Sequence, residues 1–215
     1  MGRRDRLTWF RAAALAVLGM VLWPGAVAAA AAFVGGAVCA GCHRGEAAAW
    51  SGSHHDLAMQ EATEATVLGD FDDVVFHADG VWARFFKRDG AFLVHTEGPD
   101  GVLRDYEIAY TFGVQPLQQY LIAFPDGRYQ AFALAWDTRP TEDGGQRWFH
   151  LYPGQGIRPG DALHWTGINQ NWNFMCAECH STDLKRGYDF DRDRFQTTWS
   201  EIDVSCEACH GPGSR

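Results

Sequence analysis

The residues of this sequence best suited to chemistry are three copies of one spacing, C-x-x-C-H, at 39–43, 176–180 and 206–210. In this spacing two thiols can add to the vinyl groups of a porphyrin, and the histidine that follows can ligate its iron. All six cysteines of the chain belong to these pairs. The sequence therefore predicts three c-type haems, attached at Cys39, Cys42, Cys176, Cys179, Cys206 and Cys209. The predicted proximal ligands are His43, His180 and His210.

Paired cysteines also occur in zinc sites and in disulfide frameworks. A zinc site needs four ligands for each metal and gives no reason for a histidine directly after every second cysteine. A disulfide framework suits an exported chain, but cysteines two residues apart rarely bridge to each other without strain. Covalent haem explains the whole pattern and is therefore the prediction.

The opposite face of each iron needs a second ligand, and six histidines lie outside the motifs. His54, His55 and Met59 follow the first motif by about a dozen residues, a separation from which a side chain can return to a haem. His150 and His164 precede the second motif beside aromatic residues and are predicted distal ligands. His77 and His95 fall on strand patterns, and we expect both to be partly exposed strand residues.

The chain begins with a leader. Arg3, Arg4, Arg6 and Arg11 precede an apolar run from Ala12 to Leu22, and small residues follow, which is typical of a signal peptide over 1–32. We therefore expect a periplasmic or exported protein that meets a membrane only through the leader, if the leader is not cleaved. Without the leader's four arginines and one aspartate, the net charge of −9 becomes about −12. This acidity argues against nucleic acid and favours redox partner proteins with a basic docking face.

The elements that must position the motifs are of two kinds. Residues 67–136 alternate in the manner of strands, with Asp-Gly and Pro-Asp-Gly turns between them, and predict a small antiparallel sheet. Residues 46–50 and the motifs themselves predict short helices. The predicted fold class is α+β, in which short haem-binding helices and loops of one domain, 33–215, flank a β insert at about 67–136.

Longer segments carry a family resemblance. Residues 110–120, 145–153, 164–167, 171–182 and 204–213 resemble the amino-terminal part of exported multihaem cytochromes c that continue into tetratricopeptide repeats. The chain stops at Arg215 without such repeats, so it is expected to be truncated, and in that family the repeats would add protein partners. Trp50, Ser53 and His55 also resemble a Trp-x-x-Ser-x-His pattern of multihaem cytochromes. This likeness makes His55 the preferred distal ligand, with His54 and Met59 as substitutes.

The predicted function is periplasmic electron transfer through three haems, each with histidine on both faces of the iron. Two alternatives stay open. One is a multihaem enzyme that acts on a small nitrogen or sulfur compound at an open haem, for which no residue pattern marks a site. The other is a zinc-stabilised interaction module. Carbon monoxide binding and a pyridine haemochrome spectrum would separate these classes.

Overall fold

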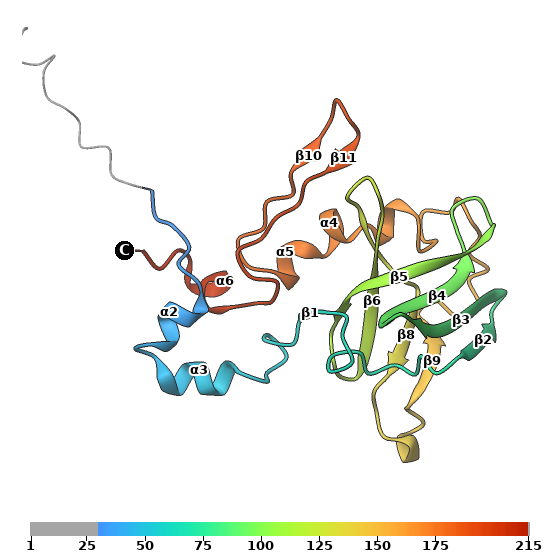
Figure 1. Ribbon diagram of the computed structural model, residues 1–215, viewed down its shortest axis with the longest axis horizontal. Helices are drawn as coiled ribbons and strands as arrows, with labels where there is room; N and C mark the ends of the chain where they lie inside the picture. The colour runs from blue at the N-terminus through green and yellow to red at the C-terminus, as the bar shows by residue number, and fades with distance from the viewer. Residues whose placement is uncertain (1–29, 215) are drawn as a thin grey trace, which may run out of the picture. The chain divides into compact units, whose positions relative to one another are not determined.

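A nine-stranded antiparallel sheet is the main element of the chain (Figure 1). The structure is a computed structural model that describes residues 30–214. The predicted signal peptide, 1–32, lies almost wholly outside the described residues. The strands are β1 Met59–Glu61, β2 Val74–Ala78, β3 Val81–Arg88, β4 Ala91–Glu97, β5 Leu103–Phe112, β6 Leu117–Ala123, β7 Tyr129–Ala131, β8 Leu134–Asp137 and β9 Arg147–His150.

The sheet follows the order β2-β3-β4-β5-β6-β8-β9, with β1 paired to β5 and β7 paired to β6. Its first two hairpins close through Asp79-Gly80 and Asp89-Gly90, where all four residues have positive φ, from 53° to 82°. These are the backbone angles that a two-residue turn needs in order to match the twist of its strands. The Asp-Gly turns predicted from the sequence are confirmed at both places.

The sheet curls around a core of aromatic side chains. Phe85 of β3 stacks on Trp148 of β9 with a centroid separation of 3.6 Å and an interplanar angle of 2°, although these strands are not neighbours. Phe71, in the segment before β2, makes edge contacts with both rings. Burial of such large rings stabilises the fold, and truncation of one to alanine typically costs about 3–5 kcal/mol.

A second buried cluster joins the sheet to the second cysteine motif. Met59 of β1 and Leu121 of β6 pack with Trp172, which is fully buried, and with Ala177. Trp172 begins helix α4, Trp172–Met175, and Ala177 begins α5, Ala177–His180. The sheet therefore supports the second motif directly.

The remaining elements are short. They are helices α2 Gly36–Ala40, α3 Arg44–Trp50 and α6 Cys206–His210, the 3₁₀ turns η1 Thr141–Asp143 and η2 Ile168–Gln170, and the hairpin β10 Tyr188–Asp189 with β11 Arg194–Phe195. No helix among the described residues is both long and apolar enough to cross a bilayer.

The predicted α+β class is wrong, because the described chain is mostly β and its sheet nearly closes on itself. The longest helix in residues 30–214 has seven residues. The sheet begins before the predicted insert of 67–136 and ends after it, because β1 pairs along β5 and β9 along β8. The short helices are attached to a curled sheet, whereas the prediction placed a small sheet among haem-binding helices.

Candidate haem-binding site

The first motif occupies the turn between α2 and α3. The N–H groups of Cys42 and His43 both donate to the carbonyl of Cys39, at 3.1 and 2.9 Å. Cys39, Cys42 and His43 therefore share one helical turn, in which residues three and four apart lie on the same side. This is the placement that two thioether bonds and one iron ligand from the same segment require.

The third motif coincides with α6. Cys206 and His210 are its first and last residues, so Cys209 again lies one turn from Cys206. The helix ends at Gly211, whose φ of 76° suits glycine and redirects the chain. The third motif thus repeats the local geometry of the first.

The first and third motifs lie together although they are far apart in the sequence. Helices α2 and α6 contact each other. Cys39 and His43 line one cavity of ≈ 370 Å³ with Cys206 and His210, and most of its wall is apolar. Burial, followed by the nearby Cys206 and Glu207, raises the pKa of the Cys39 thiol, which keeps it protonated at neutral pH. Two haem-attachment motifs therefore open into one shared space.

The second motif lies against the sheet. The Asn171 side chain accepts the Phe174 N–H at 3.0 Å and caps α4, which continues almost directly into α5. The His180 ring meets the edge of Phe112 from β5 at a centroid separation of 5.5 Å, and its buried Nδ1 has no hydrogen-bond partner. An imidazole that ligates iron through Nε2 carries a proton on Nδ1, and this proton needs a hydrogen-bond acceptor. The contacts of His180 provide no acceptor at Nδ1.

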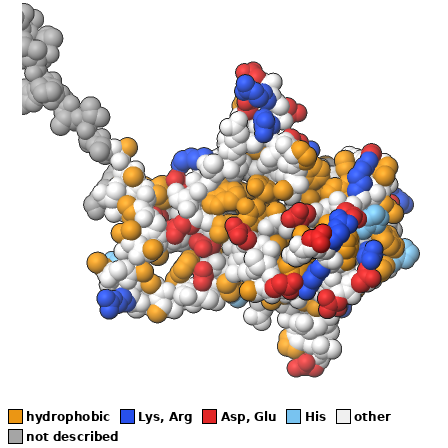
Figure 2. Space-filling view, in the orientation of Figure 1, with side chains coloured by type: hydrophobic (Ala, Val, Ile, Leu, Met, Phe, Trp, Pro, Cys, Tyr) orange, Lys and Arg blue, Asp and Glu red, His pale blue; other side chains and the backbone are white. Residues whose placement is uncertain are grey.

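The chemistry of the donor sets fits covalent haem. All six cysteines are free, and each pair shares a helical turn with a histidine. Around the second motif, Phe174 and Met175 are 60% and 55% exposed, and Figure 2 shows hydrophobic side chains gathered at the surface near α4 and α5. Large apolar side chains left open to water are characteristic of a binding surface. Within residues 30–214, no three histidine, cysteine or acidic side chains converge as ligands for a bare metal ion.

Comparison with known families agrees with this chemistry. Residues 163–211 match the family of cytochrome c554 and c-prime. The matched segment contains the second and third motifs in full, whereas the first motif and the sheet lie outside it. No curated protein and no solved structure matches the chain. The similarity to c-type cytochromes supports haem c binding and haem-based electron transfer in general.

The structure places the distal candidates near the first motif in different environments. His55 and His54 are exposed in the turn after α3. The His55 carbonyl accepts the Val204 N–H at 3.2 Å, which holds this turn beside the segment that leads into the third motif. Met59 is 1% exposed within the second buried cluster, where it packs against hydrophobic side chains. Only the two histidines of this group are therefore open to solvent.

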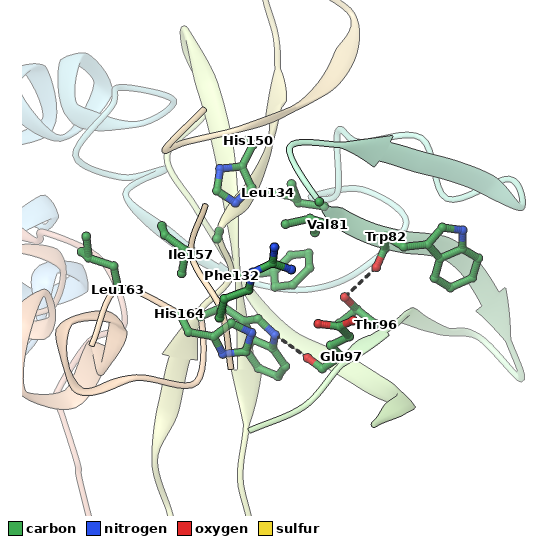
Figure 3. Close-up of a pocket in the computed structure, with 14 residues that line it drawn as sticks. Val81, Trp82, Thr96, Glu97, Phe132, Leu134, His150, Ile157, Leu163 and His164 are labelled. Carbon is green, nitrogen blue, oxygen red and sulfur yellow. Dashed lines mark hydrogen bonds between the residues drawn. The ribbon is translucent and has the colours of Figure 1, made fainter. Parts of the chain in front are cut away.

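His150 and His164 come together, but in a cavity of their own. Each is 8% exposed, and Figure 3 shows both beside Phe132 and Leu134 at one end of the sheet. None of the residues that line this cavity belongs to a cysteine motif. The distal assignment of these histidines is not tested by this placement and stays a prediction.

Hydrogen bonds at these two rings nevertheless bear on that prediction. The Tyr152 N–H donates to Nδ1 of His150 at 3.0 Å, and the Thr166 N–H donates to Nδ1 of His164 at 3.3 Å. A neutral imidazole that accepts at Nδ1 carries its proton on Nε2, where an iron ligand needs a lone pair. Burial lowers the pKa of both histidines and keeps them neutral. In the present arrangement the proton of His150 therefore lies on Nε2, whereas Nδ1 of His164 also lies 2.8 Å from Thr166 Oγ1 and can donate to it in the other tautomer.

Sequence reasoning missed two acidic residues, one within the third motif and one shortly before it. Glu207 is buried there, and Asp203 lies three residues before Cys206. Burial, with added repulsion from Glu201 and Asp56, raises the pKa of Asp203 to about 6. No pattern revealed Glu207, because the corresponding position of the second motif holds Ala177 and the acidic residue of that motif, Glu178, is exposed. Only the packing of the third motif shows that Glu207 is buried.

Proposed function

We propose that this chain is a periplasmic electron-transfer cytochrome with three covalent haems, one at each C-x-x-C-H motif. The observation that carries the proposal is that each motif folds as a single helical turn, with two free thiols and a histidine on it. Bound haem would supply the one-electron couple of its iron. His43, His180 and His210 would hold the irons from the proximal side.

Different parts of the chain would hold the three haems. The first and third motifs face a common apolar cavity, which would keep two haems as neighbours and exclude water from between them. The second motif stands on the sheet through Trp172 and Ala177, a rigid base that limits movement when the charge on the iron changes. Rigid, apolar surroundings suit electron transfer.

His55, His150 and His164 are the proposed distal ligands, and their support is unequal. The turn that carries His55 is tied to the segment before the third motif, close to two of the three attachment sites. His150 would first have to exchange the hydrogen bond at its Nδ1 for an acceptor, whereas Thr166 Oγ1, 2.8 Å from Nδ1 of His164, can already serve as one. The proposal is therefore strongest for His55.

The test is haem stoichiometry on protein made in a host with a working haem-attachment system. A pyridine haemochrome spectrum and the intact mass of the mature chain should both give three haems per polypeptide. Paired substitution of Cys206 and Cys209 by serine should remove one haem and leave two. A haem-free protein, or one whose mass shows fewer than three haems, would contradict the proposal. Fractionation of the host should recover the protein in the periplasm.

A further inference from the structure

One acidic side chain lies at the wall of the shared cavity and has no cationic side chain paired with it. Glu207 is the second residue of the third motif, is 2% exposed, and lines the cavity with Cys39, His43 and His210. Charged carboxylates are rarely buried to this extent unless they are paired. The place of Glu207 between two attachment motifs therefore calls for an explanation.

Main-chain amides satisfy this carboxylate. The Val34 N–H lies 3.0 Å from both oxygens, the Gly35 N–H donates to Oε2 at 2.7 Å, and the Gly213 N–H donates to Oε1 at 2.7 Å. No lysine, arginine or histidine within residues 30–214 forms an ion pair with it. Burial alone would raise the pKa of Glu207, but these donors hold it below its usual value. The side chain therefore keeps a full negative charge that no neighbouring cation cancels.

Two other acidic residues, Glu46 and Glu178, can be compared with Glu207, and water or a cation screens the charge of each. Glu46 lines the same cavity but is exposed to water. Glu178 is the third residue of the second motif, is exposed, and pairs with Arg186 at 3.1 Å. Exposed and paired charges act weakly on their surroundings, whereas a buried charge acts across a medium of low dielectric constant.

We infer that Glu207 lowers the reduction potential of the haems attached at the first and third motifs. The inference rests on the proposed function, because it concerns haems that these motifs would carry. Oxidised iron bears one more positive charge than reduced iron, so a fixed negative charge nearby stabilises the oxidised form. Glu207 is thus a tuning residue, which acts on the irons through the cavity and ligates neither of them.

The experiment is a spectroelectrochemical titration at pH 7.5 of fully loaded protein, its haem content checked by mass. The variants are E207Q, which removes the charge but keeps the shape, and E207D, which keeps the charge on a shorter side chain. E46Q and E178Q are the matched controls. We expect E207Q to raise the midpoint potential of at least one haem by more than either control does. We expect E207D to stay near the wild-type curve.

The outcomes separate this inference from the proposed function. Three haems by mass, with an E207Q curve that moves no more than the controls, would overturn the role of Glu207 and leave the cytochrome assignment standing. Fewer than three haems in the wild-type protein would instead count against the function. If E207Q does not load its haems, E207D is the deciding variant. Midpoint potentials near those of the wild type support a charge effect. Midpoint potentials that differ from the wild type by more than those of E46Q and E178Q contradict it.

Discussion

At the scale of the residue, the position of a histidine relative to its cysteines determines what it can do. His180 follows Cys179 directly and would be held at the iron by two thioethers. Substitution of His180 by alanine should convert one low-spin haem into a high-spin or weakly ligated haem. Electron paramagnetic resonance of the oxidised protein would show it. H77A, which alters an exposed histidine of β2, serves as the control and should leave the spectrum unchanged.

Asp203 gives a pH-dependent prediction. Its pKa is about 6 in the folded protein and near the ordinary value of 3.8 when unfolded, so the native state binds the proton more tightly. Its contribution to stability is complete below pH 3.8 and is lost as the pH rises through 6. D203N should therefore be more stable than wild type at pH 8, by about 1–2 kcal/mol after allowance for partial solvent screening, and nearly equal to it at pH 4.

Urea denaturation at the two pH values would measure the difference. D191N, which alters an exposed aspartate of the β10–β11 hairpin, is the matched control and should show no such dependence. An equal effect of D203N on the free energy of unfolding at pH 4 and pH 8 would contradict a raised pKa of Asp203.

Much of the candidate site was visible at the residue scale from the sequence. The cysteine pairs and their histidines are local patterns, and the structure places each set within one helical turn. The surroundings of the candidate distal histidines could not be predicted from the sequence. The hydrogen bonds that Nδ1 of His150 or His164 makes depend on the backbone around each ring. A sequence gives the residue type but not the tautomer that its neighbours select.

At the scale of the element, the stack of Phe85 on Trp148 joins β3 to β9 and closes the curl of the sheet. W148A should lower the free energy of unfolding by about 3–5 kcal/mol, since it removes a large buried ring and leaves a cavity. Denaturant titration followed by circular dichroism would measure it. The thioether bonds do not depend on this contact, so haem content by mass should stay the same.

V75A is the control for this prediction, because Val75 lies on β2 and is 53% exposed. Its effect should remain within about 0.5 kcal/mol. A similar loss of stability in both variants would show that the stack has no special role in the fold.

The strands were the elements most open to prediction. Alternation and Asp-Gly turns identified β2, β3 and β4 closely, because period-two patterns and two-residue turns are local features. Within the predicted insert the alternation does not separate β7 from β8, which are divided at Phe132-Ala133, and β9 lies beyond the insert. Both depend on pairing with β6 or β8, partners that a short window of sequence does not contain.

At the scale of the whole molecule, the first and third motifs share a cavity whose lining does not include the second motif. Replacement of Cys39 and Cys42 by serine should remove one haem and shift the spectrum and potential of the haem at the third motif. The haem at the second motif should change less, because the shared cavity does not include it. Intact mass and a redox titration would follow both effects.

The paired substitution of Cys176 and Cys179 is the converse experiment. It should leave the signals of the other two haems nearly as they are. Equal perturbation of every remaining haem by either substitution would show that the three sites are not grouped in this way. This grouping could not be predicted from the sequence, since the two motifs that share a cavity are the pair most distant along the chain.

The amide clamp on Glu207 also sets an order of events during folding. It joins Val34 to a residue 173 positions later, and closure of a flexible loop of that length costs about 4–5 kcal/mol of chain entropy. That loss would cancel much of what the amide contacts to the carboxylate contribute. A folded sheet shortens the effective loop, because it already gathers most of the intervening residues. The clamp should therefore close last, once the third motif is in place, and it should be the first contact to open when the sheet is weakened.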